Sequence, residues 1–342
     1  MTAARRDDLR GFVAWVSSGL MWRVSLVALV ALAGCNGKES ALDGGGPVAA
    51  DAGGDPTDAG PSPTDGGSGG DAGVFWLWGL TTDDALTNTA AQVGALRALP
   101  RRVMLRVVFD PPAAGGPYAA DYAPAVNSLS QVADVMGLPL DSSAMSAFTP
   151  AQVQARVTEY LQAMGGTVSV WEIGNELNGN WLGANAIGKT EVMFDAVKAA
   201  GKKTALTLYY ENPQTPGYEL VSWVDANIPA GHRMRAGLDY VLVSYYEDQN
   251  LGHQLSQAEL DQLFAALAAR FPSAHLGFGE FGWGGTLPSS DATRETLLRR
   301  FMGYRVPSVP AFVGGGFYWH FNVTMVPQTK PDWAVMSSIL QP

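Results

Sequence analysis

The feature that most constrains this chain is an alternation of short apolar runs with amphipathic stretches, sustained from residue 74 to residue 342. The apolar runs have the length and composition of strands, and they occupy residues 74–80, 103–108, 131–136, 167–173, 203–209, 240–245, 275–281 and 315–321. The stretches between them predict helices at about residues 83–98, 150–164, 187–200, 217–227, 256–271 and 291–304. Alternating strands and helices indicate a parallel sheet covered by helices.

Two architectures share that alternation: a closed barrel, and an open sheet with helices on both faces. Eight strands in about 250 residues is the size of a (β/α)8, or TIM, barrel. An open, doubly wound sheet is expected to carry a glycine-rich phosphate loop after its first strand, and residues 80–84 contain no glycine. We therefore expect an α/β protein with one (β/α)8 barrel over residues 74–342.

The N-terminal segment has the pattern of an export signal. Four arginines within the first 23 residues are followed by an apolar run over residues 24–33. A run of about ten residues is too short to span a bilayer as a stable helix. The run leads into Leu-Ala-Gly-Cys, which resembles the lipobox of bacterial lipoproteins, whose cysteine is lipidated and becomes the first residue after cleavage. Residues 1–35 are therefore expected to be a lipoprotein signal peptide with Cys35 as the lipidation site. The alternative is an ordinary signal peptide with an incidental cysteine.

The segment that follows, residues 36–73, is rich in glycine, aspartate and proline and has no run that could bury apolar surface. It is expected to be a disordered linker between the lipid anchor and the barrel. The expected location is the cell envelope, with the membrane as partner through the anchor. Asn36 follows the cysteine, and by resemblance to enteric sorting rules this favours the outer membrane or cell surface over the inner membrane.

Charge and composition exclude several other classes of protein. The net charge of −10 argues against a nucleic-acid partner, which would require a basic surface. Cys35 is the only cysteine, so the chain has no intramolecular disulfide and no cysteine-rich zinc site. The four histidines show no metal-ligand spacing. We expect no metal and no cofactor, although an all-oxygen calcium site stays open, and we expect a monomer.

Two glutamates occupy strand ends of the kind at which a TIM barrel carries its active site. The fourth expected strand leads into Asn175 and Glu176, and the seventh contains Glu280 next to its last residue. Glycoside hydrolysis requires such a pair, because one carboxyl group protonates the leaving oxygen while the other attacks or stabilises the anomeric carbon. The pattern thus predicts that Glu176 and Glu280 form the catalytic pair of a glycoside hydrolase.

The Asn-Glu pair and the later glutamate resemble the pattern of clan A glycoside hydrolases, the barrel group that includes cellulases, mannanases and endo-galactanases. The resemblance implies Glu176 as acid/base, Glu280 as nucleophile, and Asn175 as a partner of the sugar 2-hydroxyl. It also implies retaining double displacement on a β-linked oligo- or polysaccharide, through carboxyl groups about 5–5.5 Å apart. Glu280 would have to be held ionised and Glu176 would need a raised pKa.

Three further positions fit the same group. Arg106, in the second expected strand, matches an arginine that keeps the nucleophile ionised by its opposite charge. Tyr245, in the sixth, matches a tyrosine that hydrogen-bonds the nucleophile, and the sequence does not separate it from Tyr246 in this role. Trp319, in the eighth, matches a tryptophan that forms the floor beneath the reacting sugar.

Other residues near strand ends are secondary candidates. Trp181 and Trp283 follow strands four and seven and are expected to offer flat apolar faces to sugar rings. Glu172 lies within strand four and is expected to be a hydrogen-bonded core group. Three carboxylates are expected either to bind sugar hydroxyls or to be solvated loop charges: Asp110, Glu211 and Glu247.

The chain departs from the group in its histidines. Several subfamilies carry histidine near the ends of strands three and six, whereas the first histidine here is His232 and none lies in the sixth run. This argues against close kinship with the best-known cellulases and leaves the glycan open among cellulose-, mannan- and galactan-like polymers. Two functional alternatives stay open: a catalytically inactive barrel lipoprotein that binds carbohydrate, and transglycosylation by the same residues.

Overall fold

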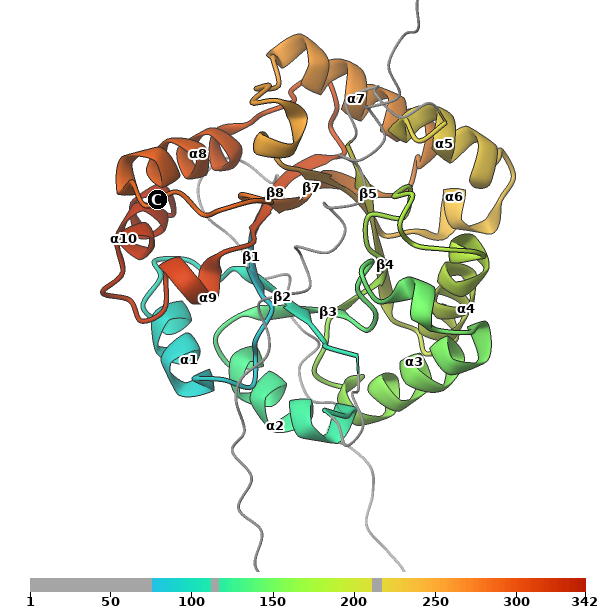
Figure 1. The fold of residues 1–342 in the computed structure, drawn as a ribbon, viewed down its shortest axis with the longest axis horizontal. Coiled ribbons are helices and arrows are strands. Elements are labelled where there is room, and N and C mark those ends of the chain that lie inside the picture. The colour runs from blue at the N-terminus through green and yellow to red at the C-terminus, as the bar shows by residue number, and fades with distance from the viewer. Residues whose placement is uncertain (1–75, 112–116, 211–216) are drawn as a thin grey trace, which may run out of the picture. The chain divides into compact units, whose positions relative to one another are not determined.

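The computed structural model describes residues 76–111, 117–210 and 217–342. Within these ranges eight parallel strands follow one another around a closed barrel in sequence order, and helices surround it (Figure 1). The strands are β1 (Leu77–Thr82), β2 (Met104–Val108), β3 (Asp134–Leu138), β4 (Val170–Gly174), β5 (Lys203–Tyr209), β6 (Tyr240–Tyr245), β7 (His275–Phe281) and β8 (Phe312–Tyr318). The predicted α/β barrel is thereby confirmed. The signal peptide, Cys35, the linker and Glu211 lie outside the described residues.

The helices mostly follow the predicted ranges. They are α1 (Thr89–Arg97), α2 (Ala119–Ser130), α3 (Pro150–Met164), α4 (Ala186–Ala199), α5 (Leu220–Asn227), α6 (Arg233–Gly237), α7 (Gln257–Arg270), α8 (Asp291–Gly303), α9 (Phe321–Thr324) and α10 (Pro331–Ile339), with short 3-10 turns η1 (Met145–Ala147) and η2 (Asp248–Asn250). Thr149 and Ser256 begin α3 and α7 with capping boxes. In each, the N-cap hydroxyl accepts from the backbone N–H three residues later, and the side chain of that later residue accepts from the N-cap backbone N–H.

Some predicted boundaries were wrong for identifiable reasons. Helix α2 carries Pro124 in its interior, and proline usually marks a helix end, so the sequence pattern hid this helix. Strand β3 consequently begins at Asp134 rather than at residue 131. Strand β8 begins at Phe312 rather than at residue 315, because its glycines resemble a loop. Gly314 and Gly316 adopt φ angles of 82° and 93° within this strand.

The barrel interior is apolar where the strands begin and polar where they end. A buried cluster fills the N-terminal part: Leu77, Met104, Met136, Val170, Ala205, Tyr240, Leu242, Val313 and Phe317. Side chains alternate along a strand, so residues two positions further on point into the same interior. These positions carry Arg106, Glu172, Thr207 and Ser244, all fully buried. The strand pattern itself therefore places a polar layer directly above the apolar one.

An irregularity in β7 brings Glu280 into this layer. Val243 pairs with Phe278 but Ser244 pairs with Glu280, so Gly279 is an extra residue in β7. A Cβ atom at Gly279 would lie 2.6 Å from the Thr207 hydroxyl oxygen, which explains why glycine occupies the position. Bulges of this kind redirect the side chain that follows, and here they turn Glu280 toward Arg106.

Candidate active site

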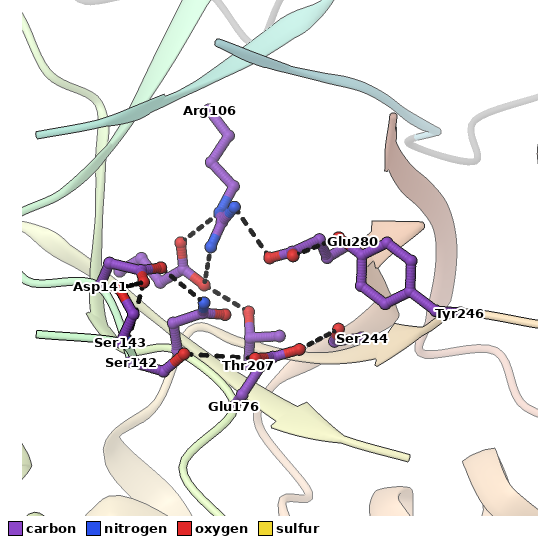
Figure 2. Close-up of polar contacts among 11 residues, drawn as sticks. Arg106, Asp141, Ser142, Ser143, Glu176, Thr207, Ser244, Tyr246 and Glu280 are labelled. Carbon is purple, nitrogen blue, oxygen red and sulfur yellow. Dashed lines mark hydrogen bonds and ion pairs between the residues drawn. The ribbon is translucent and has the colours of Figure 1, made fainter. Parts of the chain in front are cut away.

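Arg106 lies at the centre of the polar layer and pairs with two glutamates (Figure 2). Its Nε lies 2.6 Å from Glu172 Oε2, and its Nη1 lies 3.0 Å from Glu280 Oε2. The Thr207 hydroxyl donates to the other oxygen of Glu172 at 2.5 Å. Glu172 is fully buried, as expected for a core group, and shares the arginine with Glu280. The contact between Arg106 and Glu280 has the geometry of an ion pair rather than of a directed hydrogen bond.

Tyr246 is the tyrosine that contacts Glu280, and the assignment of this role to Tyr245 is corrected. The Tyr246 hydroxyl donates to Glu280 Oε1. The Tyr245 hydroxyl instead donates to the backbone carbonyl of His253 at 2.8 Å. Tyr245 is the last residue of β6 and packs with the outer core, so the first residue beyond the strand turns inward. The predicted bounds of β6 coincide with the observed ones, and what the sequence alone left open was which face of the strand points inward.

Glu176 lies just beyond β4 in a strained backbone conformation. Its φ angle is 48°, which is uncommon for a residue with a side chain and often marks a functional position. The hydroxyls of Ser244 and Ser142 donate to its two carboxyl oxygens at 2.7 and 3.2 Å. These hydroxyls come from β6 and from the loop after β3. The Glu176 side chain is thus anchored from both sides, and among the described residues no Lys, Arg or His forms a salt bridge with it.

Asn175 joins the loop after β3 to the same site. Its side-chain nitrogen donates to Asp141 Oδ2 at 3.0 Å. The side chain is buried, with the residue 2% exposed. Its oxygen accepts no hydrogen bond within the described part of the chain. Asp141 in turn accepts from the Ser143 backbone N–H and hydroxyl, so the loop itself is braced.

The candidate aromatic residues occupy different surroundings. The guanidinium carbon of Arg106 lies 5.7 Å from the centre of the Trp319 ring, which places Trp319 beside the polar layer. Trp181 is 41% exposed and meets Tyr209 edge-on at 5.3 Å. The backbone N–H of Trp283 donates to His320 Nε2. Trp319 is therefore close to Arg106, while the exposed Trp181 packs against the half-buried Tyr209 at the end of β5.

The remaining carboxylate candidates have structural partners. Arg300 donates two hydrogen bonds to Glu247, at 2.8 and 3.0 Å, and this pair fastens the segment after β6 to helix α8. Asp110 lies within reach of the Tyr122 hydroxyl at 3.4 Å. We read both as loop-stabilising groups.

Burial raises the pKa of both Glu176 and Glu280 above the ordinary glutamate value of 4.5. For Glu280, the charge of Arg106 and the hydrogen bond from Tyr246 act in the opposite direction without overcoming burial. Arg106 was expected to keep Glu280 ionised, but its charge is shared with Glu172 and does not offset the effect of burial on the pKa of Glu280. Because the charge of Glu176 raises the pKa of Glu280 further, the two groups favour holding one proton between them.

Four polar residues of this network were missed from the sequence: Asp141, Ser142, Thr207 and Ser244. A signal existed for Thr207 and Ser244, because each is a small polar residue at an inward position of an otherwise apolar strand. Asp141 and Ser142 follow β3, whose end was predicted too early. With β3 ending at Leu138, these two residues fall directly at the barrel mouth.

Within residues 76–111, 117–210 and 217–342, no group of three or more His, Cys, Asp or Glu side chains is arranged to hold a metal ion. None of the helices in these ranges combines the length and apolarity needed to cross a membrane.

No protein-family model and no curated protein sequence matches the chain. Solved structures match by shape. A glucosidase from Croceicoccus marinus aligns with a TM-score of 0.51 at 13% identity, covering 78% of this chain and 68% of that one. A β-glucosidase from Thermotoga maritima, in complex with azafagomine, gives 0.51 at 10% identity, covering 75% and 90%. These two likenesses show a shared (β/α)8 fold. A GH128 endo-β-1,3-glucanase from Amycolatopsis mediterranei aligns at 0.47 with 13% identity, covering 77% and 99%.

Proposed function

We propose that this barrel hydrolyses a β-linked glycoside with retention of configuration, with Glu280 as nucleophile and Glu176 as acid/base. The observation that carries the proposal is that both glutamates lie at the strand ends in one polar site, where the charge of Glu176 raises the pKa of Glu280 (Figure 2). They come from β7 and from the end of β4. Two carboxyl groups with different partners at one barrel mouth supply the two roles that this reaction requires.

The contacts assign the two roles. Arg106 and the Tyr246 hydroxyl stabilise negative charge on Glu280. Glu176 contacts two serine hydroxyls, while the charge of Asp141 raises the pKa of both glutamates and so does not separate them. On these contacts we assign the shared proton to Glu176, leaving Glu280 as the carboxylate.

The reaction then proceeds in two displacements. Glu280 attacks the anomeric carbon, the glycosidic C–O bond breaks, and Glu176 gives its proton to the leaving oxygen. Glu176, now ionised, takes a proton from water as the water oxygen attacks the same carbon and releases Glu280. Each displacement inverts the carbon, so the product keeps the β configuration.

The tryptophans provide surfaces on which sugar rings can stack. Trp319 lies beside Arg106, and we assign it the floor beneath the ring that Glu280 attacks. Trp181 lies closer to Glu176 in the chain and is exposed, which suits a ring on the leaving-group side. Because the fold is shared with β-glucosidases, gluco-configured substrates are the first to test.

The proposal is tested with a panel of aryl β-glycosides and soluble β-glucans, mannans and galactans. We expect the wild type to release reducing ends from at least one of them, and proton NMR to show the β-anomer as the first product. Release of the α-anomer would contradict double displacement. Absence of activity across the whole panel would instead favour a barrel that binds carbohydrate without hydrolysing it. Chromatography of the products distinguishes hydrolysis from transglycosylation, which forms longer saccharides.

The pH dependence of kcat/KM should be bell-shaped, with both limbs above the range of ordinary glutamates. Activity requires Glu280 ionised and Glu176 protonated, so it rises as the pair loses its first proton and falls as it loses the second. Because burial raises the pKa of both groups, both limbs are displaced upward from pH 4.5. Initial rates between about pH 4 and pH 10 measure this. A descending limb near pH 4.5 would contradict the shared-proton arrangement.

We further propose that the barrel is tethered to the cell envelope as a monomer through a lipid on Cys35, with the membrane as the partner of the anchor. The support is the lipobox-like sequence and the glycine-rich segment that follows it. The Cys35→Ser variant should lose incorporation of labelled palmitate and leave the membrane fraction, because no thiol is left to lipidate. Membrane association that persists in this variant would point to an uncleaved signal peptide as the anchor.

A further inference from the structure

The loop after β3 holds Asp141 with one oxygen already engaged. Asp141 Oδ1 accepts from the Ser143 backbone N–H at 2.9 Å and from the Ser143 hydroxyl at 2.6 Å. The Ala144 N–H donates to the Asp141 backbone carbonyl at 3.1 Å, closing a tight turn. These bonds hold the Asp141 carboxylate in place beside Ser143 (Figure 2). Its other oxygen, Oδ2, accepts from the side-chain nitrogen of Asn175.

The chemistry of this contact fixes which way the Asn175 amide faces. An ionised carboxylate only accepts hydrogen bonds, so the atom of Asn175 that lies 3.0 Å from Asp141 must be the amide nitrogen. The amide oxygen then points away from Asp141. This oxygen is buried and accepts no hydrogen bond from the described residues. A buried acceptor without a donor is costly, so the arrangement is suited to a donor supplied by a ligand.

We propose that Asp141 is a positioning residue that holds Asn175 with its amide oxygen toward the bound sugar, so that the site demands a hydroxyl donor there. This rests on the proposed glycosidase function. A sugar hydroxyl can both donate and accept a hydrogen bond. In this arrangement it donates to the amide oxygen of Asn175. Asp141 thus sets specificity without touching the substrate.

Two variants of Asp141 distinguish the direction of the hydrogen bond from its presence. In Asp141→Asn, the Ser143 N–H still requires an acceptor, so the new amide keeps its oxygen on Ser143 and turns its nitrogen toward Asn175. Asn175 must then turn its own oxygen toward residue 141 and its nitrogen toward the sugar. Asp141→Ala removes the contact altogether. Asp141→Asn is therefore expected to present a donor to the sugar, whereas Asp141→Ala leaves the Asn175 amide unheld.

The experiment measures kcat/KM for an aryl β-glycoside that the wild type hydrolyses and for its singly deoxygenated and singly fluorinated analogues. The ring position whose deoxy penalty shrinks in Asn175→Ala identifies the hydroxyl that Asn175 contacts. We expect this penalty to be roughly tenfold in the wild type. In Asp141→Ala it should fall to the Asn175→Ala level, while penalties at other ring positions stay unchanged.

Fluorine tests the direction of the hydrogen bond, because it accepts weakly and cannot donate. Its electronic effect on the reaction is common to all variants and cancels when they are compared. In the wild type, the fluorinated analogue should gain no contact with Asn175. In Asp141→Asn, the kcat/KM of the fluorinated analogue should rise relative to that of the deoxy analogue, because the Asn175 nitrogen can donate to fluorine. A wild-type deoxy penalty that persists in Asp141→Ala would overturn the inference while leaving the hydrolase proposal intact.

A second measurement does not depend on turnover. The side-chain amide protons of Asn175, identified in a proton–nitrogen NMR spectrum by their loss in Asn175→Ala, should be protected from solvent exchange in the wild type. They should lose protection in Asp141→Ala, and also in Asp141→Asn, where the turned amide directs its nitrogen toward the sugar site instead of residue 141. Unchanged protection in Asp141→Ala would show that Asp141 does not hold the amide, even if no substrate were found. Circular dichroism confirms that each variant is folded.

Discussion

The Glu280→Gln variant should lose activity by a factor on the order of 10⁴ or more in kcat/KM. An amide does not attack the anomeric carbon, and among the described residues Glu280 is the carboxylate that contacts both Arg106 and Tyr246. The variant should stay folded, because Glu172 continues to neutralise Arg106 at 2.6 Å. Initial rates on the best substrate of the panel, with thermal unfolding recorded in parallel, measure both effects.

Asp110→Asn is the matched control for Glu280→Gln. Asp110 also follows a barrel strand, and its carboxylate accepts from the Tyr122 hydroxyl at 3.4 Å. The control should change kcat/KM by no more than a few-fold, in line with surface substitutions that cost little. Activity that survives Glu280→Gln at near wild-type rate would remove Glu280 from the nucleophile role and leave the fold unaffected.

The barrel could be predicted from the sequence because its signal is spread over the whole chain. Apolar runs such as residues 240–245 and 275–281 coincide with β6 and β7. Local irregularities carry less signal. The extra residue Gly279 changes which side of β7 faces inward, and no periodic pattern announces such a bulge. The inward direction of Glu280 was therefore expected from resemblance and explained only by the strand pairing.

The site residues that the sequence missed lie where a small error in strand position matters. Placing β3 early left Asp141 in an unassigned loop, although it braces Asn175. The bounds of β6 were predicted correctly, but its inward face was not: Ser244 points inward, so alternation turns Tyr245 outward and Tyr246 toward Glu280. Glu176 was predicted correctly as a strand-end residue, but its positive φ depends on contacts made after folding.

Charge balance explains why the network includes more than the catalytic pair. Arg106 faces Glu172 and Glu280, and Glu176 and Asp141 add two further carboxyl groups nearby. One cation cannot offset all of them in a buried site, so retaining a proton is the less costly state. A general acid needs that retained proton at the pH where the nucleophile is ionised. The crowding of carboxyl groups is thus part of the chemistry proposed for the site.

The Glu176→Ala variant should lose activity in a way that depends on the leaving group. A general acid contributes about 10²–10⁴-fold when the leaving oxygen needs a proton, and little when the leaving group is already acidic. We therefore expect glycosides of poor leaving groups to lose kcat/KM by about that factor, while dinitrophenyl glycosides retain most of theirs. The second displacement, which also needs Glu176, becomes slow, so kcat and KM for the dinitrophenyl substrate should fall together.

Azide distinguishes the two glutamates by the product it forms. In Glu176→Ala, azide should attack the sugar attached to Glu280, restore turnover and give a β-glycosyl azide. In Glu280→Ala, azide takes the place of the missing nucleophile, attacks the substrate directly and should give the α-glycosyl azide. Proton NMR of the product reads the configuration. An α-azide from Glu176→Ala would exchange the two roles. A β-azide requires attack on a covalent glycosyl enzyme, whereas an α-azide forms by direct attack on the substrate when the nucleophile is missing.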